Sequence, residues 1–257
     1  MKIKFSILSY HPISLTNINV EFIHVGILFY NTVTNEKRLE LTKNWKRIET
    51  FDDEINLNLF KSVLKGMKNK VEKSIDFQFD RYIKKYINQL QFSDITSVDE
   101  DNFELFIENT KKMFLRYDFE KNKRITSTEQ LAYIRKLFKS TNIKFENSKI
   151  TGTFEEKIKF DYYIDNIGFK IFIFTNKDLN KLIFSAKSWA FTALELKENL
   201  GINTVFIYDS EIDNSQFKIL YKILSKNALK VMDVTSAVNF IKKEFNKQQN
   251  FNFFDND

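Results

Sequence analysis

The stretch that decides the fold is 149–209, which reads KITGTFEEKIKFDYYIDNIGFKIFIFTNKDLNKLIFSAKSWAFTALELKENLGINTVFIYD. Short apolar and alternating runs predict strands at 142–151, 157–164, 169–175 and 203–208. Between the last two, a helical period over 178–199 ends at Gly201, and glycine is the residue that most often terminates a helix. The predicted order is therefore strand, strand, strand, helix, strand. One acid, Asp161, stands inside an apolar run.

The regions that flank this stretch complete a second domain. A helical period predicts a helix at 127–139 before the stretch. After it we predict a helix at 213–226, a short strand at 229–233 and a last helix at 236–245. The end of the chain has no helical period. We therefore place the second domain at 125–246 and a flexible tail at 247–257.

The first half of the chain predicts a different kind of domain. Alternating apolar residues indicate strands at 2–10, 20–30 and 37–42, and turn residues between them favour an antiparallel sheet of at least three strands. Helical periods follow at 56–73, 75–90 and about 97–116. A charged connection at 118–124 marks the boundary, so the first domain covers 1–120. The predicted fold class is α+β, with an N-terminal antiparallel sheet plus helices and a C-terminal α/β core.

The composition limits the chemistry. The 257 residues include no cysteine and two histidines, which excludes disulfides, thiolate metal sites and most histidine-rich zinc sites. The beginning, MKIKFSILSYHP, lacks the features of a signal peptide, and the apolar run 167–174 is too short to span a bilayer. We therefore expect a cytoplasmic protein with no membrane partner. The net charge of +6 is compatible with nucleic acid, and equally with no polyanionic partner.

The N-terminal region carries a resemblance. Tyr10-His11-Pro12, followed by EFIHVGILF at 21–29, is similar to a family of short, uncharacterised bacterial domains. That family opens with Tyr-x-Pro and has a strand reading Glu-Phe-x-Asn-Val-Gly-Val, in which His24 takes the place of Asn. The resemblance implies no known activity. Glu21 and His24 are a candidate acid–base pair, although a hydrogen-bonded sheet histidine is the stronger interpretation.

The C-terminal region carries a second resemblance. From residue 127 the predicted order resembles the core of the restriction-endonuclease-like, or PD-(D/E)XK, superfamily. Its metal-dependent nucleases use an Asp near the second strand and Glu-x-Lys on the third. Gly152-Thr153 followed by Phe160-Asp161 matches the turn that leads to the metal-binding Asp. Thr175-Asn176-Lys177 stands where Glu-x-Lys is expected, so Lys177 fits the lysine and Thr175 replaces the glutamate.

This departure bears on catalysis. Metal-dependent phosphodiester hydrolysis needs converging carboxylates to hold a divalent cation, and a neutral hydroxyl is a weak ligand for Mg²⁺. Glu155, Glu156 or Asp178 could supply the missing carboxylate. The candidate catalytic residues are therefore Asp161, also the candidate metal ligand, with Lys177 and Glu156. We expect a nuclease-like fold that has lost catalysis, with no cofactor. Mg²⁺ is expected only if the chain is an active nuclease, which is one alternative.

Binding residues are indicated by charge. Lys61, Lys65 and Lys68 form a row on the predicted helix 56–73 and, with Lys177, are candidates for binding DNA or RNA; a solvated surface explains the row as well. The aromatic and acidic tail 250–257 indicates another alternative, a protein-interaction module that acts as an inhibitor or adaptor. By analogy, such chains suit bacterial defence, phage counter-defence and mobile elements.

Overall fold

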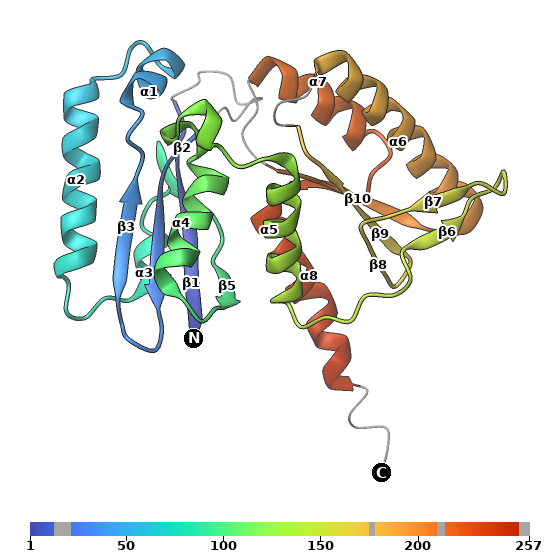
Figure 1. The fold of residues 1–257 in the computed structure, drawn as a ribbon, viewed down its shortest axis with the longest axis horizontal. Coiled ribbons are helices and arrows are strands. Elements are labelled where there is room, and N and C mark those ends of the chain that lie inside the picture. The colour runs from blue at the N-terminus through green and yellow to red at the C-terminus, as the bar shows by residue number, and fades with distance from the viewer. Residues whose placement is uncertain (13–21, 175–177, 210–213, 252–257) are drawn as a thin grey trace. The chain divides into compact units, whose positions relative to one another are not determined.

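The chain forms two compact units, Met1–Glu129 and Gln130–Asp257 (Figure 1). The computed structural model describes residues 1–12, 22–174, 178–209 and 214–251, with the backbone alone for 214–216 and 246–251. Both units combine helices with sheets, so the predicted α+β class is confirmed. The division between the units falls shortly after the charged connection predicted at 118–124.

The first unit is built on a five-stranded sheet. Its strands are β1 (Lys2–Tyr10), β2 (Ile23–Asn31), β3 (Lys37–Leu41), β4 (Leu90–Phe92) and β5 (Thr96–Asp99). The order is β3-β2-β1-β4, with β5 also paired to β1, and every pairing is antiparallel. The three predicted strands are present. The sequence did not predict β4 and β5, which pair one after the other with β1, β4 at its end and β5 at its beginning.

Helices cover both faces of this sheet. They are α1 (Trp45–Phe51), α2 (Leu57–Lys73), α3 (Phe79–Ile83) and α4 (Phe103–Phe114), followed by the 3₁₀ turns η1 (Arg116–Asp118) and η2 (Lys121–Lys123). Figure 1 shows α2 on one side of the strands and α4 on the other. The predicted helix 56–73 is confirmed as α2, whose first turn is capped by the Asn56 side chain.

The alternation of side chains along β1 and β2 explains the two covered faces. Phe5 and Phe29 point toward α4, where each ring lies about 6 Å from Phe106. Leu28, one residue along, belongs to the cluster under α2 with Leu64. A strand buried on both faces reads as a nearly continuous apolar run, as β2 does. Burial of each such phenylalanine contributes roughly 2 to 3 kcal/mol.

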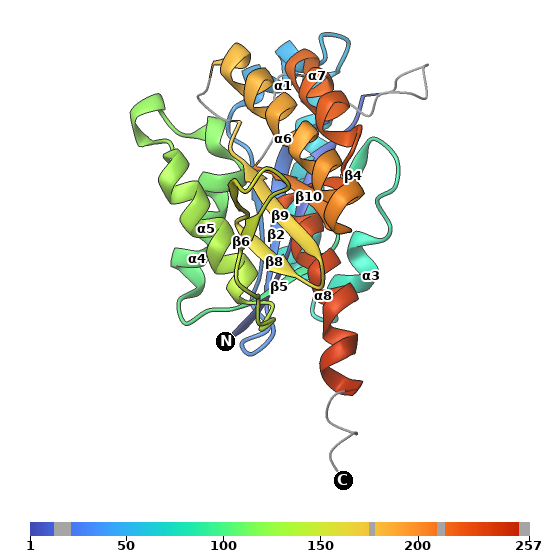
Figure 2. The ribbon, with the colours of Figure 1, turned by 90° about the vertical axis from the view of Figure 1, so that its right-hand side faces the viewer.

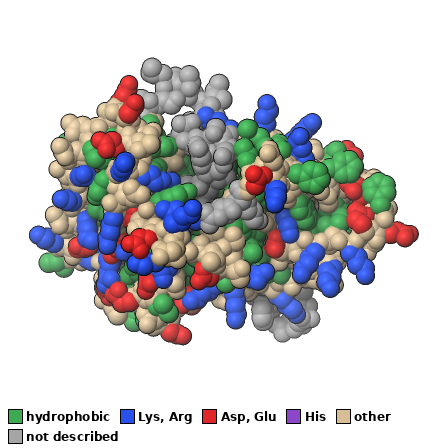
Figure 3. Space-filling view, turned by 45° about the horizontal axis from the view of Figure 1, so that its top comes forward, with side chains coloured by type: hydrophobic (Ala, Val, Ile, Leu, Met, Phe, Trp, Pro, Cys, Tyr) green, Lys and Arg blue, Asp and Glu red, His purple; other side chains and the backbone are tan. Residues whose placement is uncertain are grey.

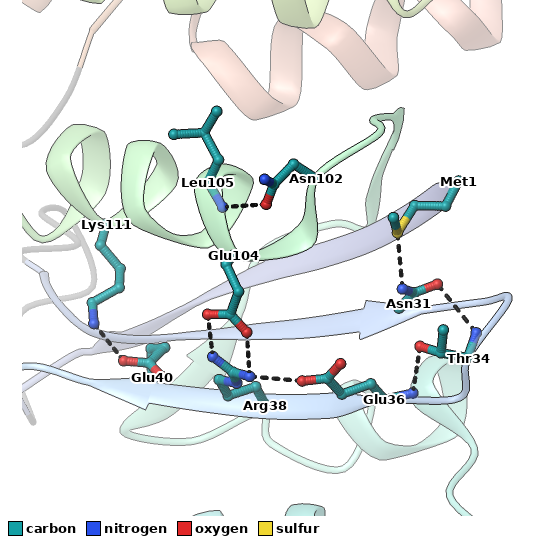
Figure 4. A network of polar contacts seen from close by, with 10 residues as sticks. All are labelled: Met1, Asn31, Thr34, Glu36, Arg38, Glu40, Asn102, Glu104, Leu105 and Lys111. Carbon is teal, nitrogen blue, oxygen red and sulfur yellow. Dashed lines mark hydrogen bonds and ion pairs between the residues drawn. The ribbon is translucent and has the colours of Figure 1, made fainter.

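Ion pairs fasten α4 to the outer strands. Arg38 on β3 contacts Glu36 and Glu104 at 2.6 Å each, and Lys111 on α4 contacts Glu40 at 2.5 Å (Figure 4). The Arg38 guanidinium holds the pKa of Glu104 below its ordinary value. Glu36 and Glu104 are exposed, so the pairs of Arg38 contribute little to stability, whereas Lys111 and Glu40 are partly buried.

Two helix predictions in the first unit need correction. The helix predicted at about 97–116 begins only at Phe103, because residues 96–99 form β5. The period of 75–90 predicted a helix, but only α3 is helical there, and the chain then bends into β4. The side chains of Ile75 and Ile87 are 94% and 75% exposed. Two of the apolar residues that suggested a helix thus make no core contact, and the edge of β1 provides backbone partners that a helix could not use.

The second unit is built on a mixed sheet. Its elements are α5 (Ser127–Lys139), β6 (Lys149–Thr151), β7 (Lys157–Lys159), β8 (Tyr162–Ile164), β9 (Ile167–Phe172), α6 (Leu179–Leu200), β10 (Asn203–Tyr208), α7 (Asn214–Ser225), β11 (Lys230–Asp233) and α8 (Val234–Phe251). The sheet order is β11-β10-β9-β8. Strands β9, β10 and β11 are parallel and β8 is antiparallel to β9, while β6 and β7 form a separate hairpin.

Helices α6 and α7 lie side by side on one face of this sheet (Figures 1 and 2). The strands meet them through Phe172 and Phe206, and Leu182 of α6 belongs to the same cluster. On the other face, the ring centroids of Phe169 and of Phe240 on α8 lie 6.4 Å apart.

Among the described residues, none of the helices combines the length and apolarity needed to cross a bilayer.

The boundaries in the second unit confirm some predictions and correct others. Helix α6 begins after the Asp178 cap and ends at Gly201, whose φ of 67° is left-handed, as predicted. The strand predicted at 157–164 is two strands, because the chain turns at Phe160 and Asp161. The strand predicted at 142–151 is confined to its last three residues. Residues 247–251, predicted to be tail, continue α8; residues 252–257 lie outside the described part of the chain.

Candidate functional site

Asp161 lies at the bend between β7 and β8. Its backbone N–H donates to the carbonyl of Phe169 at 2.9 Å, and its Oδ2 accepts the N–H of Ile171 at 2.8 Å. The side chain thus occupies a place in the ladder where a backbone carbonyl would ordinarily accept. This gives Asp161 a structural task whatever else it does.

The cation beside Asp161 is Lys170, which the sequence did not single out. The Nζ of Lys170 lies 3.3 Å from Oδ2 of Asp161 and 4.8 Å from the ring centroid of Trp189. Lys177, the cation predicted for this position, and Thr175 lie outside the described residues. Among the residues that the structure describes, the lysine in contact with Asp161 belongs to β9.

Two residues before Lys170, on the same face of β9, stands Gly168. If Lys170 is taken as the lysine of Glu-x-Lys, Gly168 is at the glutamate position. A Cβ added there would lie 2.3 Å from the ring of Phe160, which is 1% exposed. No side chain fits at 168 without displacing that ring. The position that would hold a second carboxylate is filled by an aromatic ring.

The other acids considered for the site serve the local backbone. Glu156 folds over the β6–β7 turn and accepts the N–H of Phe154 at 3.0 Å. Asp178 caps α6 by accepting the N–H of Lys181 at 3.1 Å. Glu155, in the same turn, has a left-handed φ of 63°. Within the described ranges, no three His, Asp or Glu side chains gather closely enough to hold a metal ion.

Replacing Asp161 tests its structural role. We expect Asp161→Ala to lower the free energy of unfolding of the second unit by about 2 kcal/mol, because a charged acceptor is lost from a backbone N–H. Asp161→Asn, which keeps an acceptor for Ile171, should lose less than half as much. Urea unfolding followed by Trp189 fluorescence measures both. Equal losses would mean that the ion pair with Lys170, rather than the hydrogen bond, stabilises the bend.

The outer face of the β6–β7 hairpin gathers three lysines. Lys149 directly opposes Lys159, and Lys157 lies on the same face opposite Thr151. All three lysines are exposed, whereas Ile158, which points the other way, packs against Leu196. Like charges directly opposite each other destabilise a strand pair. An anionic ligand would reverse that effect, so we define Lys149, Lys157 and Lys159 as the lysine face.

The lysine row predicted on α2 is less available than its sequence suggests. The Nζ of Lys61 lies 5.3 Å from the ring centroid of Trp45, and Lys68 contacts Glu72 at 3.5 Å. Lys65 is exposed. The space-filling view in Figure 3 shows Lys and Arg side chains spread over the visible surface rather than collected in one stripe. Lys61 and Lys68 therefore already have partners within the first unit.

The two histidines lie near each other in the first unit. The Nδ1 of His24 is 3.0 Å from the hydroxyl of Ser9, as expected for a sheet histidine, and Glu21 lies outside the described residues. The ring of Phe22 lies 5.5 Å from His11 and 5.4 Å from His24. Burial, and secondly the charge of His24, lowers the pKa of His11 from its ordinary value of 6.5.

This lowered pKa makes the first unit sensitive to acid. Below pH 6.5 the unfolded chain binds a proton at His11 more readily than the folded chain, so stability falls with pH until the folded pKa is passed. We expect unfolding at pH 5.5 to need less urea than at pH 7.5. His11→Phe should reduce that difference. A pH dependence unchanged by this substitution would assign the effect to other groups.

Comparison of the chain with protein-family models, with curated proteins and with solved structures finds no match.

Proposed function

We propose that the chain binds nucleic acid through its second unit without cleaving it. The lysine face is the observation that supports this most directly, because phosphodiesters neutralise lysines that otherwise repel one another. A two-stranded ribbon also fits the major groove of a duplex. Phe154, in the turn between β6 and β7, is 73% exposed and offers a ring on which an unpaired base can stack.

The surroundings of Asp161 support binding without cleavage. Hydrolysis by a bound metal needs carboxylates that converge on the cation. Here Asp161 is engaged by Ile171 and Lys170, and Phe160 fills the space above Gly168. The sequence resemblance to the nuclease-like superfamily rests on three strands between two helices, whereas four strands lie between α5 and α6, with β6 and β7 in a separate hairpin. A nuclease-like origin therefore rests on the sequence resemblance alone. A role in bacterial defence, phage counter-defence or a mobile element rests on that analogy.

The proposal is tested with labelled single-stranded and double-stranded oligonucleotides in the presence of Mg²⁺ or Mn²⁺. We expect fluorescence anisotropy to rise on binding while gel electrophoresis shows intact oligonucleotide. Cleavage that disappears with Asp161→Ala would instead establish the active nuclease. Unchanged anisotropy with DNA and RNA at low salt would refute nucleic-acid binding.

A second candidate function, binding of a partner protein, rests on a cavity in the first unit. The cavity measures about 540 Å³ and lies between α2 and the segment 85–90. Its lining includes Leu59, Val63 and Ile87, which are 63%, 44% and 75% exposed. Clustered exposed apolar side chains are typical of interaction sites. A partner recovered with the native chain and lost with Ile87→Asp would favour this function, whereas recovery by both would exclude this cavity.

A further inference from the structure

Three arginines in the first unit surround one tyrosine. The guanidinium carbons of Arg47, Arg124 and Arg116 lie 4.0, 5.0 and 5.6 Å from the ring centroid of Tyr117. No two of these carbons can therefore be more than about 11 Å apart. We define Arg47, Arg116, Tyr117 and Arg124 as the Tyr117 cluster. It brings Arg47 together with Arg116 and Arg124, which follow some 70 residues later in the sequence.

Hydrogen bonds from Asp118 hold the cluster together. Its carboxylate accepts the hydroxyl of Thr42 at 2.5 Å, the N–H of Lys43 at 2.8 Å and the N–H of Asn44 at 3.2 Å. The amide of Asn44 in turn donates to the carbonyl of Tyr117 at 3.0 Å. The start of α1, which carries Arg47, is thereby fastened to η1. Both carboxylate oxygens of Asp118, the acid next to Tyr117, accept hydrogen bonds in these contacts.

The cluster retains donors for a ligand. Arg124 donates from Nε to the carbonyl of Phe119 at 3.1 Å, and in the described part of the chain its two Nη groups donate to nothing. Arg116 is 3% exposed and lies beneath the surface, whereas Arg47 and Arg124 are half-buried. A guanidinium has five N–H donors in a planar fork, and Arg124 uses one of them in its contact with Phe119.

We propose that the Tyr117 cluster is a binding site for a phosphate group. A phosphate carries negative charge to a place where three guanidinium groups lie around one ring. Its several anionic oxygens can accept from more than one arginine fork, whereas a carboxylate has only two oxygens. Cation–π contacts with the Tyr117 ring hold the guanidinium groups in place, so less conformational entropy is lost when the ligand binds. Lys43 and Lys46, exposed beside the cluster, add charge that attracts the anion.

The ligand can be a terminal phosphate or a phosphodiester within a strand, and two probes separate them. Calorimetry of the full chain should show that inorganic phosphate binds more tightly than acetate at equal ionic strength. A single-stranded oligonucleotide with a 5′-phosphate is then compared with the same strand ending in a 5′-hydroxyl. Tighter binding of the phosphorylated strand identifies a terminal phosphate. Equal binding that depends on Arg124 identifies internal phosphodiesters.

Variants of the cluster decide the proposal. We expect Arg124→Gln and Arg47→Gln each to weaken phosphate binding about tenfold or more, since each removes hydrogen bonds to a charged ligand. Arg124→Lys should recover only part of the loss, because lysine lacks the fork. Arg81→Gln, an exposed arginine elsewhere in the same unit, is the matched control and should bind as the native chain does.

Two results would overturn the phosphate site. One is unchanged binding of phosphate and of both oligonucleotides by the Arg47 and Arg124 variants, with thermal unfolding showing that they fold. The other is binding of an acetylated acidic peptide as tightly as of phosphate, which would indicate a carboxylate partner. The lysine face belongs to the other unit, so replacing it leaves this test intact. The two proposals can therefore fail separately.

Discussion

Gly168→Ala is expected to destabilise the second unit by about 3 kcal/mol, near the upper end of what overpacking a core usually costs. The added Cβ would lie 2.3 Å from Phe160, whose ring is buried against Trp189 at 5.6 Å. The ring or the strand backbone must therefore move. For a unit of this size we expect the midpoint of thermal unfolding to fall by about 10 °C, which calorimetry and Trp189 fluorescence can follow.

Two comparisons make that result specific. At Gly66, in the interior of α2, an added Cβ would meet nothing within 4 Å, so Gly66→Ala should instead stabilise the chain by about 0.5 to 1 kcal/mol. In a Phe160→Ala background the ring is gone, and Gly168→Ala should then cost almost nothing. Gly168→Ala could instead lower the free energy of unfolding equally with and without the Phe160 ring. In that case the ring does not fill the position of the second carboxylate, and this support for lost catalysis fails.

Replacement of the whole lysine face has the second large effect. We expect Lys149→Gln, Lys157→Gln and Lys159→Gln together to weaken nucleic-acid binding on the order of 100-fold near 0.1 M salt, because three phosphate contacts are lost. Stability should be retained or slightly improved, since Lys149 and Lys159 oppose each other across the hairpin. Anisotropy titration measures the first effect and thermal unfolding the second.

The matched control removes the same charge from elsewhere in the second unit. Lys197, Lys222 and Lys226 are exposed on α6, on α7 and just after α7. Their joint replacement by glutamine should weaken binding only a few-fold, through net charge alone. If both triple variants lose the same affinity, binding depends on overall charge and the lysine face has no special role.

Long amphipathic helices were the most predictable part of the fold. Helices α2 and α6 match their sequence periods, and their starts follow from Asn56 and Asp178, whose side chains cap them. The segment 75–90 failed because strand pairing with β1 depends on a partner some 80 residues earlier. A local pattern contains no information on that pairing, and tertiary contacts override weak helical periods.

The contact between Asp161 and Lys170 could have been predicted from the sequence, although Lys177 was chosen instead. The hairpin between β8 and β9 turns at Asp165 and Asn166, whose φ values of 47° and 57° are those of a two-residue turn with both residues left-handed. That turn pairs Tyr162 with Phe169, which brings the next residues outward, Asp161 and Lys170, opposite each other. Comparison with Glu-x-Lys favoured Lys177, and counting from the turn would have found Lys170.

Other features of the site had little signal in the sequence. The ring of Phe160 over Gly168 depends on the bend at Asp161, and the arginines around Tyr117 come from segments whose proximity is set by Asp118. Both are products of tertiary packing. Part of the lysine face, by contrast, can be recognised in the sequence, because Lys157 and Lys159 alternate along β7. The position of Lys149 opposite Lys159 is known only from the structure.

The most direct test of the central claim is the salt dependence of binding. The logarithm of the association constant for a single-stranded oligonucleotide is measured against the logarithm of salt concentration, for the native chain and for the triple variant of the lysine face. We predict a steep negative slope for the native chain and a slope shallower by about 2 for the variant. A native slope near zero, or identical slopes for the two proteins, would contradict binding through the lysine face.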